Sequence, residues 1–197
     1  MKNISMIKKI VNLIFEAFHL KQVKHEWRRL AGVQNPDSVA EHSLSAAQIW
    51  YILANMEWAD SSKVVKMLIW HDIAETRIGD IHKIGARYIS GKKEAEKKIW
   101  QDQLSLLPFS DEIISLLKEM DEKSTIEWKI AKDADYLEMA FQWKVYLELW
   151  HGEANDWIQN VGRALKTESG KQIWIEMTNT GFADWWKQSH LKKLPNN

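Results

Sequence analysis

The chain has 197 residues, with 27 basic and 27 acidic side chains and no cysteine. The absence of cysteine excludes disulfides and thiolate zinc sites, and the balanced charge provides no general field that would attract extended nucleic acid. With 45% hydrophobic residues but only 8 glycines and 3 prolines, the composition predicts an all-α helical bundle in a single domain over residues 1–197.

The first predicted element is an amphipathic helix that ends near Leu20. Because Lys8 and Lys9 interrupt its apolar run, we expect a core helix, not a signal peptide or a membrane span; a helix on a membrane surface is the alternative. No other stretch approaches the roughly 18 consecutive apolar residues that cross a bilayer, so we expect a cytoplasmic protein without a membrane partner. The apolar positions are Ile4, Ile7, Ile10, Val11, Ile14, Phe15 and Phe18.

A basic connecting segment at 21–36 precedes the second predicted helix. Ser38 and Glu41 are in the register of a capping box, in which each side chain bonds the backbone N–H of the other residue, and an apolar periodic run continues through Leu53. This register places His42 in the first turns of the helix.

A third helix is predicted to start at Asp60 or Ser61, either of which can cap it. It carries the chain to His71 and Asp72 near its end, and Gly79 marks the break that follows. The charged segment 91–98 opens the next predicted helix, which Pro108 closes. The remaining predicted helices lie at 111–120, at about 125–150, at about 156–165 and at about 171–187.

Two histidines and two aspartates on these helices form a candidate metal site. Their nitrogen and oxygen donors suit a divalent first-row transition metal better than calcium. The long gaps between them require helices packed side by side, with the ligands inside a bundle, where a cation would justify burying carboxylates. Helix phase does not decide whether Asp133 or Asp135 is the fourth ligand. The alternative to a metal site is that the His-Asp dipeptide occurs by chance. The candidates are His42, His71, Asp72 and Asp135.

Glu75 lies four residues after His71 and three after Asp72, so it shares a helix face with both. It can therefore stand beside the ligands as an acid/base group that hydrogen-bonds a metal-activated water. The alternative is an exposed partner for Arg77 or Lys83.

The pattern H...HD...D, in the contexts VAEHSLSAA, WHDIAETRIGDI and AKDADYLEMAFQ, resembles the HD-domain phosphohydrolases, and specifically the small 5'-deoxynucleotidases. The likeness runs from about His25 to Tyr146. It implies an HD domain with a metal-site core at about 25–150 and C-terminal helices at 154–190 packed on it. The ligands that it implies are His42, His71, Asp72 and Asp135, with Asp135 favoured over Asp133.

The resemblance also implies roles around the metal. Glu75 matches the catalytic glutamate of the family, and Asp80 matches the carboxylate that contacts the sugar 3'-hydroxyl. Trp27 corresponds to a tryptophan beside the sugar and base. His25 stands where several relatives have a phosphate-binding arginine, so Arg28 is the first choice for the phosphate contact and His25 the next. Surface solvation is an equal alternative for Arg28 and for the remaining candidate, Arg29.

The function implied is metal-dependent hydrolysis of deoxynucleoside 5'-monophosphates to deoxynucleosides and phosphate. We expect one divalent transition metal ion, which is cobalt, manganese, zinc, nickel or iron, a small nucleotide substrate, and a homodimer. One alternative is another HD hydrolase, acting on nucleoside triphosphates, guanosine tetraphosphate or cyclic nucleotides; the tetraphosphate enzymes resemble HDxxED, and Thr76 replaces that last aspartate here. The other is a non-catalytic helical metal-binding scaffold, which would need neither Glu75 nor Asp80.

Overall fold

The computed structural model describes residues 2–105, 107–149 and 151–187, and side chains of the first helix from residue 6 onward. Residues 1, 106, 150 and 188–197 of the predicted ranges, and the side chain of Ile4, lie outside this description. The described residues form helices and no β-strand, which confirms the all-α prediction, and none of these helices is long and apolar enough to cross a membrane. In chain order they are α1 (Lys2–Phe18), the 3-10 helix η1 (His19–Lys21), α2 (Glu26–Arg29), α3 (Val39–Met56), α4 (Ser61–His71), α5 (Glu75–Ile78), α6 (Lys83–Ala86), α7 (Lys92–Leu104), α8 (Ser110–Glu122), α9 (Ile126–Glu148), α10 (Ala154–Ala164), α11 (Glu168–Asn179) and α12 (Asp184–Lys187).

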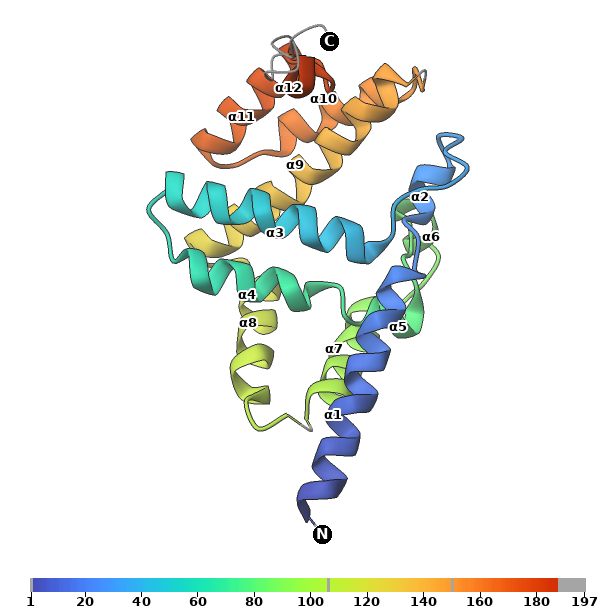
Figure 1. The fold of residues 1–197 in the computed structure, drawn as a ribbon, viewed down its shortest axis with the longest axis vertical. Helices are drawn as coiled ribbons and strands as arrows, with labels where there is room; N and C mark the ends of the chain where they lie inside the picture. The colour runs from blue at the N-terminus through green and yellow to red at the C-terminus, as the bar shows by residue number, and fades with distance from the viewer. Residues whose placement is uncertain (1, 106, 150, 188–197) are drawn as a thin grey trace, which may run out of the picture.

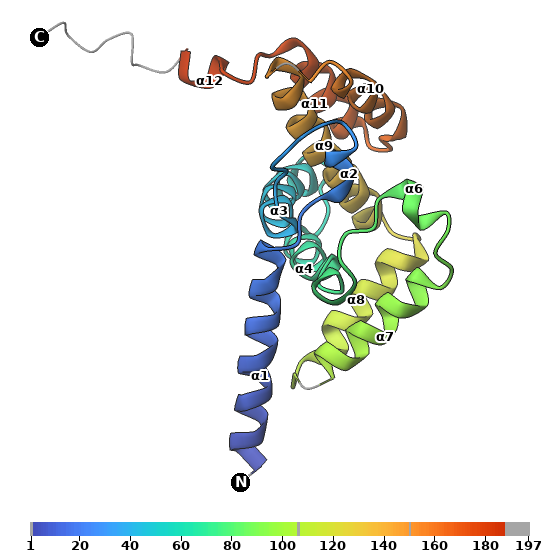
Figure 2. The same ribbon diagram turned by 90° about the vertical axis from the view of Figure 1, so that its right-hand side faces the viewer.

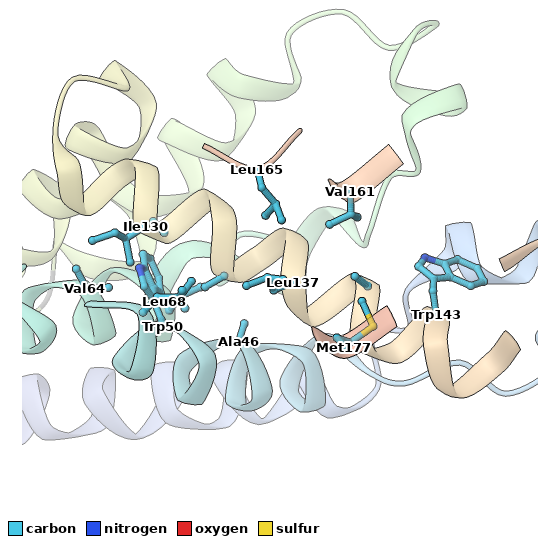
Figure 3. Packing of buried hydrophobic residues seen from close by; sticks show 14 of the residues in the cluster. Ala46, Trp50, Val64, Leu68, Ile130, Leu137, Trp143, Val161, Leu165 and Met177 are labelled. Carbon is cyan, nitrogen blue, oxygen red and sulfur yellow. The ribbon is translucent and has the colours of Figure 1, made fainter. Parts of the chain in front are cut away.

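The main core forms where α3, α4 and α9 pack against one another (Figure 1). Trp50 of α3, Leu68 of α4 and Ile130 of α9 gather in it, each with at most 1% of its surface exposed (Figure 3). Full burial of such a side chain contributes about 1.5 to 3 kcal/mol. Farther along α9, Leu137 extends this core toward α10 and α11, which also pack on α9. The core therefore fixes the relative positions of the three helices that carry the candidate ligands.

The start of α3 confirms the predicted capping box. The Ser38 hydroxyl accepts a hydrogen bond from the Glu41 backbone N–H at 3.3 Å, and the Glu41 carboxylate accepts one from the Ser38 backbone N–H at 2.6 Å. Two orphan N–H groups are thus satisfied at the helix start. The cap sets the register of α3 and places His42 in its first turns.

The start of α4 is capped by Asp60 and not by Ser61. Oδ1 of Asp60 accepts a hydrogen bond from the Lys63 backbone N–H at 2.9 Å. The helix then runs to His71, its last residue, and Asp72 follows directly as the C-cap. Both side chains therefore project from the same helix end.

The predicted break at Gly79 is confirmed. Its φ of +70° lies in the region that glycine adopts at little cost and that side chains disfavour. The reversal brings Asp80 back to the start of α2, where its Oδ2 accepts a hydrogen bond from the Glu26 backbone N–H at 2.9 Å. A short turn thereby joins two segments that lie 54 residues apart in the chain.

The prediction that α1 is a core helix is wrong. Of its described side chains only Leu13 is buried, in a small cluster against α7 and α8 that Ile10 joins in part. Figure 2 shows α1 extending away from the rest of the molecule, so the described chain covers only one side of it. The amphipathic pattern is present, but most of its apolar face is at least 42% exposed, at Ile7, Val11, Ile14, Phe15 and Phe18.

The prediction of one helix at 171–187 is also wrong. α11 begins earlier, because Thr167 caps it by accepting a hydrogen bond from the Gly170 backbone N–H at 3.1 Å. It ends at Asn179, and the Gly181 backbone N–H then donates to Asp184 Oδ2 at 3.0 Å. That bond starts the separate helix α12, so the local turn overrides the apolar periodicity.

Candidate metal centre

The structure brings together all four predicted metal ligands, from α3, the end of α4 and α9. His42 Nε2 lies 3.3 Å from Asp135 Oδ1 and 3.9 Å from Asp72 Oδ2. His71 Nε2 lies 2.9 Å from the same oxygen of Asp72. One ligand atom each from His42, His71 and Asp72 falls within 4.8 Å of the others. The spacing of these three residues lets one ion contact all of them, and Asp135 stands beside His42 as the proposed fourth ligand.

Hydrogen bonds fix the orientation of both imidazoles. Nδ1 of His71 lies 2.7 Å from the Leu68 carbonyl oxygen, which can only accept, so Nδ1 carries the proton. Nδ1 of His42 lies 2.6 Å from Glu138 Oε2 and donates in the same way. In both rings Nε2 is then the nitrogen aimed at the aspartates. The Nε2 atom of His71 is buried and faces Asp72 Oδ2 at 2.9 Å, which is the side on which a metal ion would bind.

The charges of the cluster favour ionised carboxylates facing the imidazoles. Burial would raise the pKa of Asp72, but the neighbouring His71 outweighs it and lowers that pKa to about 2. Burial also opposes ionisation of Asp135, yet Lys132 and His42 hold its pKa well below the ordinary value. For His42, burial lowers the pKa, and the hydrogen bonds to Asp135 and Glu138 more than offset this. The site therefore concentrates negative charge where a cation would lie.

Glu75 is buried beside this cluster. Its Oε2 has no hydrogen-bond partner among the described residues, and 8% of the residue is exposed. Burial, followed by the charges of Asp72 and Asp80, raises its pKa to about 10. At neutral pH the carboxyl group of the metal-free protein therefore holds a proton, and the predicted exposed pairing with Arg77 or Lys83 does not form, because Glu75 is buried.

Asp80 and His25 form a pair at the edge of the ligand cluster. His25 Nδ1 lies 3.3 Å from Asp80 Oδ2, and the His25 ring meets the His42 ring edge-on with 4.8 Å between centroids. The Nε2 atom of His25 is buried and has no hydrogen-bond partner among the described residues. Two polar groups from separate segments thus face the region next to the metal ligands.

The other three predicted substrate contacts are engaged elsewhere. Trp27 is 8% exposed and packs edge-on against Trp143 and Trp157, with ring centroids 5.6 Å and 4.7 Å away. Arg28 has no exposed surface and pairs with two carboxylates of the chain, discussed below. Arg29 is exposed and pairs with Glu26 at 3.1 Å. Their contact with a substrate stays a prediction, and their present partners point to supporting roles.

The structure separates Asp133 from Asp135, which helix phase alone could not do. Asp133 has no exposed surface, and its Oδ2 accepts hydrogen bonds from the Thr167 backbone N–H at 2.6 Å and from the Thr167 hydroxyl at 2.7 Å. The Lys166 backbone N–H donates to the same carboxylate at 2.9 Å. Asp133 therefore anchors the junction of α10 and α11, and Asp135 faces the histidines.

Sequence reasoning missed two residues of the centre. Glu138 was visible as a carboxylate three residues after Asp135, but only its contact with His42 reveals what it does. Lys132 precedes Asp135 by three residues, and its Nζ lies 2.5 Å from Asp135 Oδ2. The i,i+3 spacing of both from Asp135 was the available signal.

Comparison with known proteins finds sequence similarity to relatives that are named 5'-deoxynucleotidases. It is 30% identical over 128 residues to the 5'-deoxynucleotidase hdd1 of Schizosaccharomyces pombe, covering 62% of this chain and 64% of that protein. It is 28% identical over 134 residues to the 5'-deoxynucleotidase HDDC2 of Homo sapiens, covering 67% of this chain and 65% of the relative. The similarity thus spans just under two thirds of the length of these relatives.

Solved structures share the fold over most of the chain. A conserved hypothetical protein from Pyrococcus furiosus matches with a TM-score of 0.72 and 29% identity, over 86% of this chain and 99% of that chain. A protein from Pyrococcus horikoshii matches with a TM-score of 0.73 and 27% identity, over 86% and 98%. The family model of the HD domain matches residues 17–174. The chain therefore belongs to the HD domain family, as its HD pattern predicted.

Proposed function

We propose that the chain is a metal-dependent 5'-deoxynucleotidase that converts deoxynucleoside 5'-monophosphates to deoxynucleosides and phosphate. The observation that carries this proposal is the convergence of two imidazoles and two aspartates beside the buried carboxyl group of Glu75. The similarity to relatives named 5'-deoxynucleotidases supports the substrate class. A purely structural metal site would need no acid beside its ligands.

The donor set suits one divalent transition metal ion, such as cobalt, manganese, zinc, nickel or iron. His42 and His71 would bind it through Nε2, and Asp72 and Asp135 through one carboxylate oxygen each. When bound, the cation would supply positive charge that polarises the phosphoryl group and lowers the pKa of an attacking water.

Glu75 supplies the proton transfer. In the hydrolysis, water oxygen bonds to phosphorus, the bond from phosphorus to the 5'-oxygen breaks, and one proton moves from the water to the departing oxygen. The Glu75 carboxyl group is buried, and its Oε2 has no hydrogen-bond partner among the described residues. It interacts electrostatically with Asp72 and Asp80. A positioned acid/base of this kind contributes about 10²-fold to 10⁴-fold to a rate.

Asp80 is the proposed acceptor for the sugar 3'-hydroxyl. Its carboxylate is held by the Glu26 backbone N–H and by His25, so the substrate would meet an oriented group. For the phosphate, the unpartnered Nε2 of His25 and the ammonium of Lys132, which lies beside Asp135, are better located than Arg28, which has no exposed surface. Trp27 and Arg29 would support the position of this segment.

Phosphate release tests the function. The purified chain is stripped with a chelator, reloaded separately with cobalt, manganese, zinc, nickel, iron or magnesium, and given a panel of deoxy- and ribonucleoside 5'-monophosphates. The proposal expects metal-dependent release of phosphate from the deoxynucleotides. If the chain hydrolyses only triphosphates or guanosine tetraphosphate, it is the alternative HD hydrolase and not a 5'-deoxynucleotidase. If it binds metal but hydrolyses no nucleotide, it is a non-catalytic metal-binding scaffold.

We also propose that the chain is a homodimer that covers the exposed side of α1. An amphipathic helix normally buries its apolar face against another surface. Here Phe15 is 70% exposed and Ile7 and Phe18 are each 53% exposed on a helix that extends from the body (Figure 2). Pairing with a second copy would bury this face.

A further inference from the structure

We propose that Glu138, held in place by Arg28, is a positioning residue that fixes His42 as a metal ligand. The inference rests on the metal site of the proposed function, and not on the identity of the substrate. It reassigns Arg28 from a phosphate contact to a buried support of the metal centre.

The contact between Glu138 and His42 determines which imidazole nitrogen faces the cluster. Glu138 Oε2 lies 2.6 Å from His42 Nδ1, and His42 is only 2% exposed. Because the carboxylate accepts the Nδ1 proton, Nε2 is turned toward Asp135 and Asp72. A carboxylate behind a ligating histidine fixes the tautomer and the ring orientation and makes the nitrogen more basic.

Arg28 holds that carboxylate from the other side. One of its terminal nitrogens, Nη2, donates to the same Oε2 of Glu138 at 3.2 Å, and the other forms an ion pair with Asp37. The Tyr146 hydroxyl donates to Asp37 Oδ1 at 3.3 Å. A continuous series of polar contacts thus links Tyr146 of α9 to Asp37, which precedes α3, and Asp37 to Arg28 of α2. From Arg28 the series continues to Glu138 of α9 and ends at His42 of α3.

The residues that link Tyr146 to His42 are too deeply buried to be explained as solvated surface groups. Arg28 has no exposed surface and Glu138 is 4% exposed. Desolvating a guanidinium costs several kcal/mol, and an apolar side chain of similar volume is often at least as stabilising as a buried ion pair. The arrangement instead places a fixed negative charge behind the one ligand that contacts both aspartates of the site.

Cobalt binding to the metal-free full-length chain tests the proposal without using turnover. Affinity is measured by competition with a chromophoric chelator, and ligand geometry by the visible absorption of bound cobalt. We expect Glu138→Ala to weaken cobalt binding about 10-fold to 100-fold and to change the spectrum. Glu138→Gln keeps an oxygen that can accept from Nδ1, so it should restore part of the affinity.

Arg28 and a control on the same helix complete the design. Arg28→Met removes the support of Glu138 and should weaken cobalt binding by about tenfold, with Arg28→Lys recovering part of the loss. Asp133→Asn is the matched control, because Asp133 is an equally buried acid of α9 whose carboxylate accepts hydrogen bonds from Lys166 and Thr167, just before α11. It should lower the stability of the fold and leave the cobalt spectrum unchanged.

A purely structural role would overturn the inference. That result would be parent-like cobalt affinity and spectrum in folded Glu138→Ala or, if that variant does not fold, in Glu138→Gln. A parent chain that binds no cobalt would overturn it as well. A parent that binds cobalt in a Glu138-dependent way but hydrolyses no nucleotide would support the inference and remove the proposed function, so the two failures are distinguishable.

Discussion

The helices α9 and α1 both carry regularly spaced apolar residues but differ in what covers those residues. On α9, Ile130 and Leu137 have no exposed surface, because α3, α4 and the C-terminal helices pack around them. On α1, Phe15 and Ile7 are more than half exposed, because that helix extends from the body (Figure 2). Apolar periodicity therefore predicts which face of a helix is apolar, while the long-range packing decides whether this chain buries it. The metal centre lies in the buried region, where three helices meet.

The largest expected effect is on catalysis inside the buried region. Glu75→Gln removes the ionisable group and keeps its size, so turnover of a deoxynucleoside monophosphate should fall by about 10²-fold to 10⁴-fold. Because Glu75 is not a ligand, the metal content should stay at the parent level. Phosphate release and elemental analysis measure the two quantities, and Glu94→Gln on the exposed side of α7 is the control. Parent-like turnover of Glu75→Gln would remove its acid/base role.

The next effect contrasts the stability of the two regions. Trp50→Ala should lower the free energy of unfolding by about 3 to 5 kcal/mol, because it opens a cavity in the core between α3, α4 and α9. Ile14→Ala on α1, made in a Phe15→Asp background that prevents pairing, should change it by no more than about 0.5 kcal/mol. Urea unfolding gives both values. Equal losses would mean that α1 belongs to the same packed unit as α9.

A charge on the apolar face of α1 should break the proposed dimer. Phe15→Asp places a carboxylate in the face that pairing would bury, and we expect the dissociation constant to rise at least tenfold, which light scattering after size exclusion measures. Asn12→Asp adds the same charge at another exposed position of α1 and should leave the chain dimeric, with the same mass of the assembly as the parent. A monomeric parent that binds lipid vesicles would instead favour the membrane-surface reading of this helix.

The last expected effect is a pH dependence of the stability of the metal-free protein. The folded pKa of Glu75, about 10, lies above its ordinary value of 4.5, so between these values the folded chain holds a proton that the unfolded chain has released. Its contribution to stability is complete below pH 4.5 and is lost as the pH rises toward 10, with a slope of at most about 1.4 kcal/mol per pH unit. Urea unfolding at pH 6 to 9 with a chelator should show the decline, and Glu75→Gln should reduce it. If the free energy of unfolding of Glu75→Gln declines with pH as steeply as that of the parent, Glu75 is not the cause. The decline would then come from other groups, such as His42 and His71, whose raised pKa values act in the same direction.

The sequence was sufficient for features encoded by short spacing. The capping box of Ser38 and Glu41, the end of α4 at His71 and the glycine break at Gly79 all follow from neighbouring residues, and the HD pattern identified the family. The four ligand candidates also came from the sequence, although their convergence depends on helix packing.

Features that depend on contacts across the fold could not be read from spacing. Arg28 lies in a basic segment of the sequence, and its long-range partners Asp37 and Glu138 explain why it is buried. Asp133 and Asp135 are two residues apart, and the difference between them comes from Thr167, which lies 34 residues downstream of Asp133. In the same way, the exposure of α1 depends on which segments reach it.

The most direct test of the metal centre is a crystal structure of the cobalt-loaded protein with anomalous diffraction data. The account predicts one anomalous peak between α3, α4 and α9, within about 2.0 to 2.2 Å of His42 Nε2, His71 Nε2 and an oxygen of both Asp72 and Asp135. A cobalt ion bound elsewhere, or one that leaves Asp135 beyond ligand distance, would contradict it.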